Sequence, residues 1–127
     1  MSEQSEWAET LPDNCPPSEA WEPNNEVYYR LVDSHPPTVR DFASNRELQP
    51  QRRLKSVTEC EARSLSVYDN VEECRKVQKF PALRNKQVAK VALMPECGVV
   101  LQTTSNLFHH SWWLKAACDP VSICEPV

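Results

Sequence analysis

The sequence predicts a small α+β domain, in which an antiparallel sheet of four to six strands packs against two short helices. The chain has 127 residues, which is enough for one modest hydrophobic core. Short runs of β-branched and aromatic residues recur along it, and segments with helix-capping signals separate some of them. A sheet of this size can remain open or curl into a barrel, and the pattern allows both forms.

The first 26 residues differ in composition from the rest of the chain. They contain seven acidic residues, four prolines and no lysine or arginine. Such a segment buries too little apolar surface to offset its chain entropy. We therefore expect a disordered acidic arm over residues 1–26 and a single α+β domain over residues 27–127. Residues 28–127 carry 14 basic and 11 acidic side chains, a net charge near +3, so the arm could fold back on the domain.

The first strand is predicted over residues 26–32, where β-branched and aromatic side chains continue up to a proline-containing segment. A short helix is predicted over residues 38–48, because Thr38 and Asp41 have the spacing of a capping box. Its expected buried stripe consists of Val39, Phe42 and Ala43. Residues 50–60 are polar and basic without periodicity, so a loop is expected there.

A second strand is predicted over residues 62–68, since Leu65 and Val67 alternate with polar side chains. A second helix follows Asn70, which is a favourable N-cap residue, and it ends before Pro81. Acidic side chains occupy the first turn of this segment and basic ones its later turns, the order that the helix dipole favours.

A β-hairpin is the strongest local prediction. Residues 87–93 and 99–104 are rich in strand formers, and the turn between them has a proline near its start and Gly98 at its end. Further strands are predicted over residues 108–114 and, more briefly, over residues 121–124.

Composition also restricts the class of protein. No run of 18 apolar residues and no apolar N-terminal segment is present, so we expect a cytoplasmic protein without a membrane partner. In a reducing compartment the six cysteines are expected to be thiols. The single glycine, Gly98, excludes glycine-rich phosphate loops.

No cofactor or metal ion is predicted. Cys118 and Cys124 with an upstream histidine lack the compact spacing of zinc knuckles. Cys97 lies in a turn, but the neighbouring Glu96 would raise its pKa, which disfavours a thiolate nucleophile.

The most site-like feature is the cluster His109-His110-Ser111-Trp112-Trp113. In a strand, His109 and Trp113 share one face while His110 and Trp112 share the other, so the two histidines do not face one metal ion. One interpretation is an aromatic-walled pocket or interaction surface with a histidine that titrates near neutral pH. The other interpretation places one tryptophan in the core and one at the sheet edge, with the histidines merely hydrogen-bonded.

Arg30 on the first strand and Ser64-Leu65-Ser66 on the second form another candidate site. Their order resembles the arginine and Ser-x-Ser elements of the arginine-type ADP-ribosyltransferases. In that family the arginine and serines hold NAD and a later glutamate polarises the ribose, so the resemblance implies a nucleotide ligand. This chain departs from the pattern, because Glu96 lies in a turn and Glu125 lies next to the C-terminus. The alternative is that the serines face solvent and Arg30 pairs with a nearby carboxylate.

Two hypotheses on function follow, and the lack of a complete catalytic constellation favours the first. The first is an accessory or regulatory protein that binds another protein through Trp112, Trp113 and the two adjacent histidines. The second is a small enzyme or binding protein that acts on a nucleotide or nucleic acid with Arg30, Ser66 and one of the histidines. A basic loop and aromatic residues elsewhere could form a groove for nucleic acid, but the basic cluster is small and the acidic arm would oppose such binding. This loop contains Arg52, Arg53 and Lys55.

Overall fold

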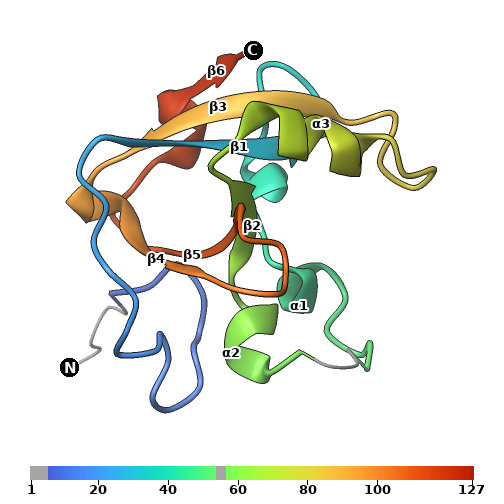
Figure 1. Cartoon of the computed structure of the whole chain (residues 1–127). Coiled ribbons are helices and arrows are strands. Elements are labelled where there is room, and N and C mark those ends of the chain that lie inside the picture. The colour runs from blue at the N-terminus through green and yellow to red at the C-terminus, as the bar shows by residue number, and fades with distance from the viewer. Residues whose placement is uncertain (1–5, 54–56) are drawn as a thin grey trace.

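The computed structural model describes residues 6–53 and 57–127. These residues form a six-stranded antiparallel sheet with the strand order β4-β5-β2-β1-β3-β6 (Figure 1). The strands are β1 (Glu26–Val32), β2 (Leu65–Tyr68), β3 (Gln87–Leu93), β4 (Gly98–Gln102), β5 (His109–Leu114) and β6 (Cys124–Pro126). The predicted α+β class and antiparallel sheet are therefore confirmed.

The sheet bends where β1 meets β2. β1 pairs with β3 along its whole length, whereas its register with β2 has one pair of Cα partners, Tyr29 and Tyr68. In Figure 1, β1, β3 and β6 lie above β4 and β5, and β2 runs between the two groups. β4 and β6 remain at the two edges of the sheet, so the barrel-like closure that the sequence allowed does not form.

The helices are short. They are α1 (Asn45–Leu48), α2 (Glu59–Ala62) and α3 (Val71–Gln78), and 3-10 turns occupy Val39–Phe42, Pro95–Cys97 and Pro120–Ile123. α3 confirms the second predicted helix and its start, because Asn70 Oδ1 accepts a hydrogen bond from the Glu73 N–H at 3.1 Å. This N-cap satisfies a backbone donor that the first turn of a helix otherwise leaves unpaired.

The first predicted helix, over residues 38–48, is divided into a 3-10 turn and α1. Ala43 is extended between them, and Ser44 then serves as the N-cap of α1. The break changes which side chains are buried: Phe42 packs into the core as predicted, but Val39 is 78% exposed. The prediction of one continuous helix is wrong because Ser44, a capping residue, interrupts the apolar pattern.

Two predicted strands begin later than expected. α2 occupies the start of the predicted strand 62–68, because Thr58 caps a helical turn through its side-chain contact with the Glu61 N–H. Residues 120–123 form a 3-10 turn that starts at a proline, so the last strand begins at Cys124. In both cases a local capping or proline signal shifts the boundary.

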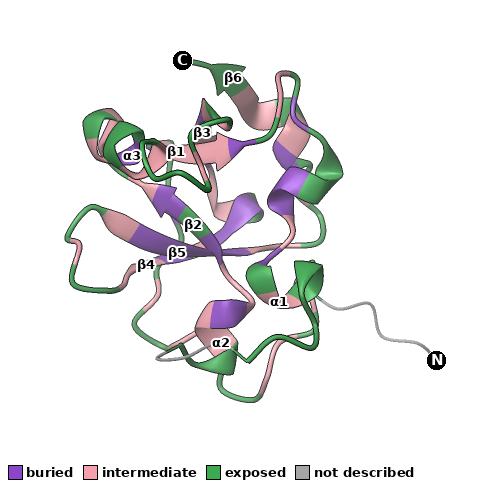
Figure 2. Cartoon of the chain, turned by 90° about the vertical axis from the view of Figure 1, so that its right-hand side faces the viewer, coloured by how far each residue is buried: buried purple, intermediate pink, exposed green. Residues whose placement is uncertain are grey.

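The hydrophobic core is formed by side chains from the strands of the bent sheet. Each of the following is at most 3% exposed: Tyr28, Val32, Leu65, Val67, Ala89, Val91, Leu93, Val100 and Trp112. Buried residues are prominent along β2 and β5 in Figure 2. The indole of Trp112 donates a hydrogen bond to the backbone oxygen of Cys97 at 2.9 Å, so the polar atom of this large core side chain is satisfied.

Gly98, the single glycine of the sequence, allows β4 to approach β5 closely. Its φ is +132°, and a Cβ atom at this position would lie 1.9 Å from the backbone oxygen of Trp113. No side chain fits there without moving the backbone of β5. The β-hairpin predicted for residues 87–93 and 99–104 does not form, because β3 pairs with β1 and β6 whereas β4 pairs with β5. The turn that ends at Gly98 instead carries the chain to the opposite edge of the sheet.

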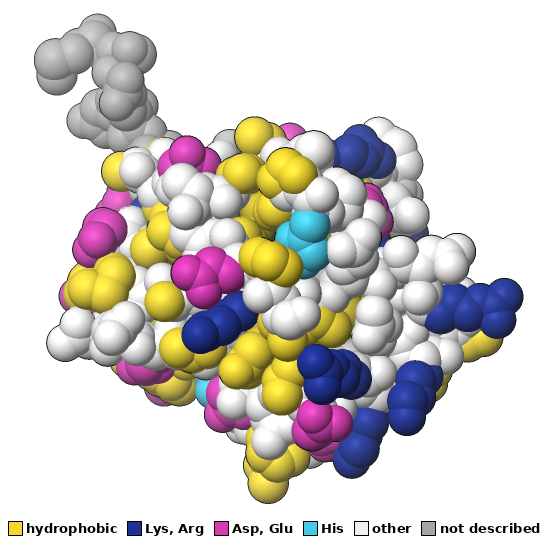
Figure 3. Space-filling view, turned by 90° about the horizontal axis from the view of Figure 1, so that it is seen from above, with side chains coloured by type: hydrophobic (Ala, Val, Ile, Leu, Met, Phe, Trp, Pro, Cys, Tyr) yellow, Lys and Arg dark blue, Asp and Glu magenta, His cyan; other side chains and the backbone are white. Residues whose placement is uncertain are grey.

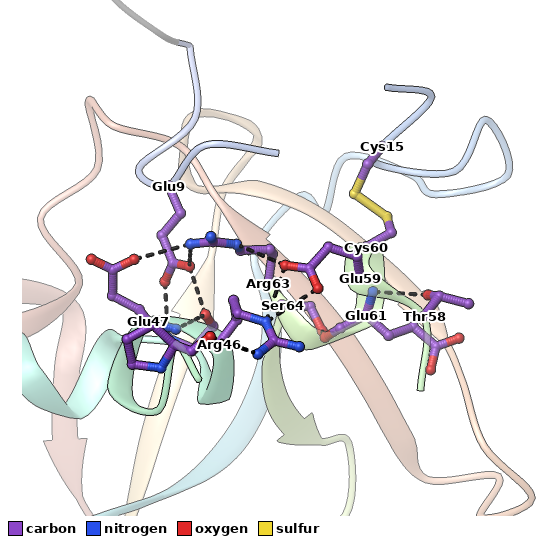
Figure 4. Close-up of polar contacts among 12 residues, drawn as sticks. Glu9, Cys15, Arg46, Glu47, Thr58, Glu59, Cys60, Glu61, Arg63 and Ser64 are labelled. Atoms are coloured by element: carbon purple, nitrogen blue, oxygen red, sulfur yellow. Dashed lines mark hydrogen bonds and ion pairs between the residues drawn. A yellow bond between two sulfur atoms is a disulfide. The ribbon is translucent and has the colours of Figure 1, made fainter. Parts of the chain in front are cut away.

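The described part of the acidic arm, residues 6–26, contacts the domain. Trp7 forms a β-bridge with Lys115, and Trp21 forms one with Val100. A disulfide joins Cys15 to Cys60 in α2 (Figure 4). The expectation that all six cysteines are thiols is wrong for this pair, whereas the other four, Cys74, Cys97, Cys118 and Cys124, are free.

Glu9 is the polar anchor of the arm. Its carboxylate accepts hydrogen bonds from the backbone N–H and the hydroxyl of Ser44 at 2.9 and 2.6 Å, and Ser44 is 1% exposed. Arg63 lies between Glu9, Glu47 and Glu59 at 3.4, 3.0 and 3.4 Å (Figure 4). Residues 6–26 are thus attached to the domain rather than free. The division of the chain after residue 26 stays a prediction.

The disulfide is expected to stabilise the domain. Cys15 and Cys60 are separated by 45 residues. Closing a loop of that size removes unfolded-state entropy equivalent to about 4 kcal/mol in the chain-entropy model, and measured effects are commonly about 2–4 kcal/mol. The double substitution Cys15→Ser and Cys60→Ser should lower the free energy of unfolding in urea by an amount in that range. Equal stability of the variant and the parent chain would contradict a bridged native state.

Candidate functional site

Arg30 lies in β1 at the place where β1 and β2 separate. Its Nε and Nη2 donate hydrogen bonds to the backbone oxygen of Asp41 at 3.0 and 2.9 Å, and its Nη1 donates to the backbone oxygen of Ser66 at 2.7 Å. The guanidinium carbon is 5.8 Å from the centre of the Phe42 ring. One planar cation therefore connects β1, β2 and the 3-10 turn that precedes α1.

Arg30 remains charged at neutral pH. Burial lowers the pKa of its guanidinium to about 10, and the Asp41 carboxylate opposes that shift. Asp41 is itself 8% exposed, and its carboxylate accepts hydrogen bonds from the N–H groups of Asp33 and Thr38 at 2.8 and 2.9 Å. The alternative in which Arg30 pairs with a carboxylate is not seen among the described residues, because carbonyl oxygens accept its hydrogen bonds and Asp33 pairs with Lys86 at 2.6 Å.

A cavity of about 440 Å³ opens beside this guanidinium, and we call it the Arg30 cavity. Its polar lining consists of Arg30, Asp33, Arg40, Asp41, Asn45, Ser66, Tyr68 and Lys86. Its apolar lining includes Leu31, Leu48, Val77 and Leu83. A smaller hollow of about 80 Å³ lies next to it and includes Ser64. The two serines named with Arg30 in the sequence therefore both lie near Arg30.

A chain of hydrogen bonds runs from the Arg30 cavity toward β5. Ser66 Oγ is 3.0 Å from His109 Nε2, and His109 Nδ1 is 3.0 Å from Thr103 Oγ1. Thr103 Oγ1 is in turn 2.9 Å from Ser111 Oγ. Ser66 is exposed and Ser111 is buried, so these four residues, here called the Ser66–His109 chain, lead inward from the surface.

The surroundings of His109 fix its tautomer. The backbone oxygen of Thr103 lies 3.3 Å from Nδ1 and can only accept a hydrogen bond, so Nδ1 carries the proton. Nε2 is then free to accept the hydrogen bond of the Ser66 hydroxyl. Burial lowers the pKa of His109 below its usual value of 6.5, while the Thr103 carbonyl opposes the shift. His109 is therefore neutral at pH 7 and can act as a base.

The tryptophans do not form the surface that the sequence analysis expected. Trp112 and Trp113 are 0% and 1% exposed, on opposite faces of β5. Trp113 donates a hydrogen bond from its indole to the backbone oxygen of Cys60 at 2.9 Å. Each face of β5 is covered, so both tryptophans are core residues. His110 is 6% exposed, with its ring against Tyr28 at 5.2 Å.

The remaining sequence candidates lie apart from the Arg30 cavity. In the part of the chain that the structure describes, no three histidine, cysteine or acidic side chains are arranged to hold a metal ion. Burial raises the pKa of Cys74, Cys118 and Cys124 to about 11, 12 and 11, which keeps these thiols protonated. The basic loop contributes neither Arg52 nor Arg53 to the cavity lining. Lys55 lies outside the described residues.

The sequence marks Arg30, Ser66 and His109 as candidates but does not place them together. The sequence does not mark Lys86, Asp41 or Thr103 as parts of a site. Lys86 lies in a connecting segment, Asp41 carries a helix-capping signal and Thr103 falls in a predicted strand. The alternation of polar and apolar residues along the predicted strand 62–68 gave one useful signal. It predicts that Ser66 and Tyr68 share a face of this strand and that this face is polar. The pairing of β2 with β5, which brings His109 to Ser66, has no signature in the sequence.

Comparison with family models, curated proteins and solved structures finds no match to this chain. Within residues 6–53 and 57–127, no helix has the length and apolar character needed to cross a membrane.

The titration of His109 tests the geometry of the Ser66–His109 chain. Since its pKa in the folded state is below 6.5, the unfolded state binds more protons as pH falls through 6.5, so folding stability should decrease there. Nitrogen-detected NMR should find a His109 pKa below 6.5 and a proton on Nδ1. The variant His109→Gln should lose this part of the pH dependence. A pKa above 6.5, or a proton on Nε2, would contradict the assigned hydrogen bonds.

Proposed function

We propose that this protein binds a nucleotide-type ligand in the Arg30 cavity, with Arg30 and Ser66 in its wall and His109 hydrogen-bonded to Ser66. The observation that carries the proposal is the convergence of these three residues. They come from β1, β2 and β5, up to 79 positions apart in the sequence (109 − 30), and Ser66 contacts both of the others. Convergent polar and titratable groups beside a cavity are the usual mark of a ligand site.

The charge of the cavity favours an anionic ligand. Three cations, Arg30, Arg40 and Lys86, line it together with two carboxylates, Asp33 and Asp41. Asp41 accepts backbone hydrogen bonds with both oxygens and is buried, so its charge is already engaged. Arg30 uses three of its N–H groups on carbonyl oxygens, and within the described residues its other two have no partner. A phosphate group would match these donors.

The size and walls of the cavity fit a nucleotide. A volume of about 440 Å³ lies in the range of small-molecule sites, roughly 300–1,000 Å³. Tyr68 offers an aromatic ring, and Leu83, Val77 and Leu48 offer apolar area for a base. The glycine-free lining means that phosphate recognition here would rely on side chains rather than on a backbone loop.

The resemblance to arginine-type ADP-ribosyltransferases supports the same class of ligand. In that family the arginine and the serines hold NAD, and Arg30, Ser64 and Ser66 lie beside one another here. No glutamate lines the Arg30 cavity in the described part of the chain, and His109 lies next to Ser66 instead. We therefore propose nucleotide binding, with NAD among the ligands to be tested, and do not assign ADP-ribosyl transfer.

The alternative of a protein-interaction module has weaker support. It was based on exposed tryptophans, and Trp112 and Trp113 are buried. The connection before β5 does expose two apolar side chains, Leu107 at 75% and Phe108 at 38%. A protein partner, and the cytoplasmic location assumed for it, stay predictions.

Nucleotide binding can be measured by calorimetry and thermal shift with ADP, NAD and uncharged adenosine. ADP and NAD should stabilise the domain, by about 2.7 kcal/mol at a hundredfold excess over Kd. Adenosine should bind at least about tenfold more weakly, because a charge-assisted hydrogen bond contributes about 1.5–3 kcal/mol. Lys86→Ala and Arg40→Ala should weaken ADP binding by a similar factor.

Arg53→Ala provides the matched control, since Arg53 is an exposed cation outside the cavity lining. It should leave the affinity for ADP unchanged. The proposal fails if neither ADP nor NAD binds at millimolar concentration, or if the Arg53 variant weakens binding as much as the Lys86 variant does.

A further inference from the structure

We infer that Ser66 is a nucleophile activated by His109, and that it cleaves an acyl ester carried by the anionic ligand of the Arg30 cavity. The identity of the ligand rests on the proposed function, whereas the nucleophile rests on geometry alone. Three conditions are met at this position: a hydroxyl at the cavity surface, a base within hydrogen-bond distance, and a group that orients the base.

The first condition is access. Ser66 is exposed, lies in the middle of β2 and lines the Arg30 cavity. Within the described residues its hydroxyl has a single hydrogen-bond partner, His109 Nε2 at 3.0 Å. Ser64, two residues earlier, differs because it donates its hydroxyl proton to the backbone oxygen of Glu61 at 2.7 Å. Ser66 alone of the two therefore combines access with a base.

The second and third conditions concern His109. Its Nδ1 is held by the backbone oxygen and hydroxyl of Thr103 at 3.3 and 3.0 Å, and Thr103 is held by the buried Ser111. The His109 ring also packs edge-to-face with the Tyr68 ring, with ring centres 5.3 Å apart. The ring thus presents Nε2 to Ser66, which is the arrangement that a hydroxyl nucleophile needs for removal of its proton.

The reaction conserves atoms and charge with water as the sole co-reactant. Ser66 Oγ bonds to the ester carbonyl carbon while its proton passes to His109 Nε2. The carbon–oxygen bond to the alcohol breaks, and the leaving oxygen takes that proton. Water then attacks the acyl group on Ser66 and gives a proton to Nε2. The bond between Ser66 and the acyl group breaks, Oγ regains the proton, and a carboxylic acid is released.

Arg30 supplies the positive charge that this reaction needs nearby. Its Nη1 is 2.7 Å from the backbone oxygen of Ser66, so a guanidinium lies beside the attacking residue. A fixed cation in a partly closed cavity stabilises the negative oxygen that forms when the carbonyl is attacked. The same cation would hold the phosphate of a nucleotide ester. The positive charge of the cavity therefore favours substrates that carry a phosphate.

The nucleophile can be tested with a fluorophosphonate probe, which forms a covalent bond with activated serine hydroxyls. Intact mass and peptide mapping should locate one adduct on Ser66 of the full-length protein. Ser66→Ala should abolish labelling, and His109→Gln should slow it at least 100-fold, the lower end of the usual effect of a general base. Ser122→Ala is the matched control, since Ser122 is exposed and bonded to a carbonyl. It should be labelled at the parent rate.

A pH profile separates activation from mere exposure of the hydroxyl. The labelling rate should rise as His109 loses its proton, with a midpoint below pH 6.5. The titratable groups near the imidazole are Tyr68 from β2 and His110 from β5, and Arg30 lies on the other side of Ser66. His110→Gln should keep the midpoint within 0.5 pH unit, roughly the expected effect of removing one neighbouring charge.

The outcomes distinguish this inference from nucleotide binding. Labelling at Ser66 that depends on His109 supports the nucleophile, whether or not ADP binds. Nucleotide binding without labelling, or labelling that His109→Gln leaves unchanged, overturns the nucleophile and leaves the binding proposal intact. Circular dichroism of each variant establishes that it is folded. If His109→Gln unfolds, His109→Asn and the pH profile of the parent protein decide the matter.

Discussion

The arrangement of the molecule depends on one half-buried cation, Arg30, at the point where the sheet divides. β1 and β2 share one pair of Cα partners, so the backbone supplies little of the cohesion between the two halves of the sheet. Arg30 adds one hydrogen bond across this junction, to Ser66 on β2, and two more that attach Asp41 in the turn before α1. A planar guanidinium with five donors suits this task, and a lysine does not.

The same constraint places the candidate site. Because β1 and β2 separate, a cavity forms between their diverging ends, and Arg30 necessarily lies in its wall. Ser66 is held there by the guanidinium on one side and approaches His109 on the other. The structural role and the proposed binding role of Arg30 are therefore not alternatives. Three of its donors hold the fold, and the remaining two are available to a ligand.

Much of the fold could be predicted from the sequence, and the limits have physical causes. Strands 26–32 and 87–93 and the helix after Asn70 carry strong local signals and are confirmed. The predicted hairpin of residues 87–93 and 99–104 is wrong, because β3 pairs with β1 and β6 whereas β4 pairs with β5. The first helix was predicted too long because Ser44, a capping residue, interrupts the apolar period. The charges of the arm and of the domain indicated that the arm could fold back, but not that a disulfide and Glu9 attach residues 6–26 to the domain.

For the site, residue types could be predicted and their proximity could not. Arg30, Ser66 and a histidine were named as a possible set, but strand order is a non-local property that alternation does not reveal. The two tryptophans were misplaced for a related reason. Alternation correctly put Trp112 and Trp113 on opposite faces of one strand, yet only the tertiary structure tells that both faces are covered.

Equilibrium unfolding of Arg30→Met, with Arg30→Lys and Arg75→Met beside it, tests the central claim most directly. Loss of three charged hydrogen bonds leaves the buried carbonyl of Asp41 without a donor, so Arg30→Met should lower the free energy of unfolding by about 2–4 kcal/mol. Arg30→Lys should recover only part of that loss. Arg75 forms an exposed pair with Glu72, and its substitution should cost less than about 1 kcal/mol. Equal costs for Arg30→Met and Arg75→Met would contradict the account.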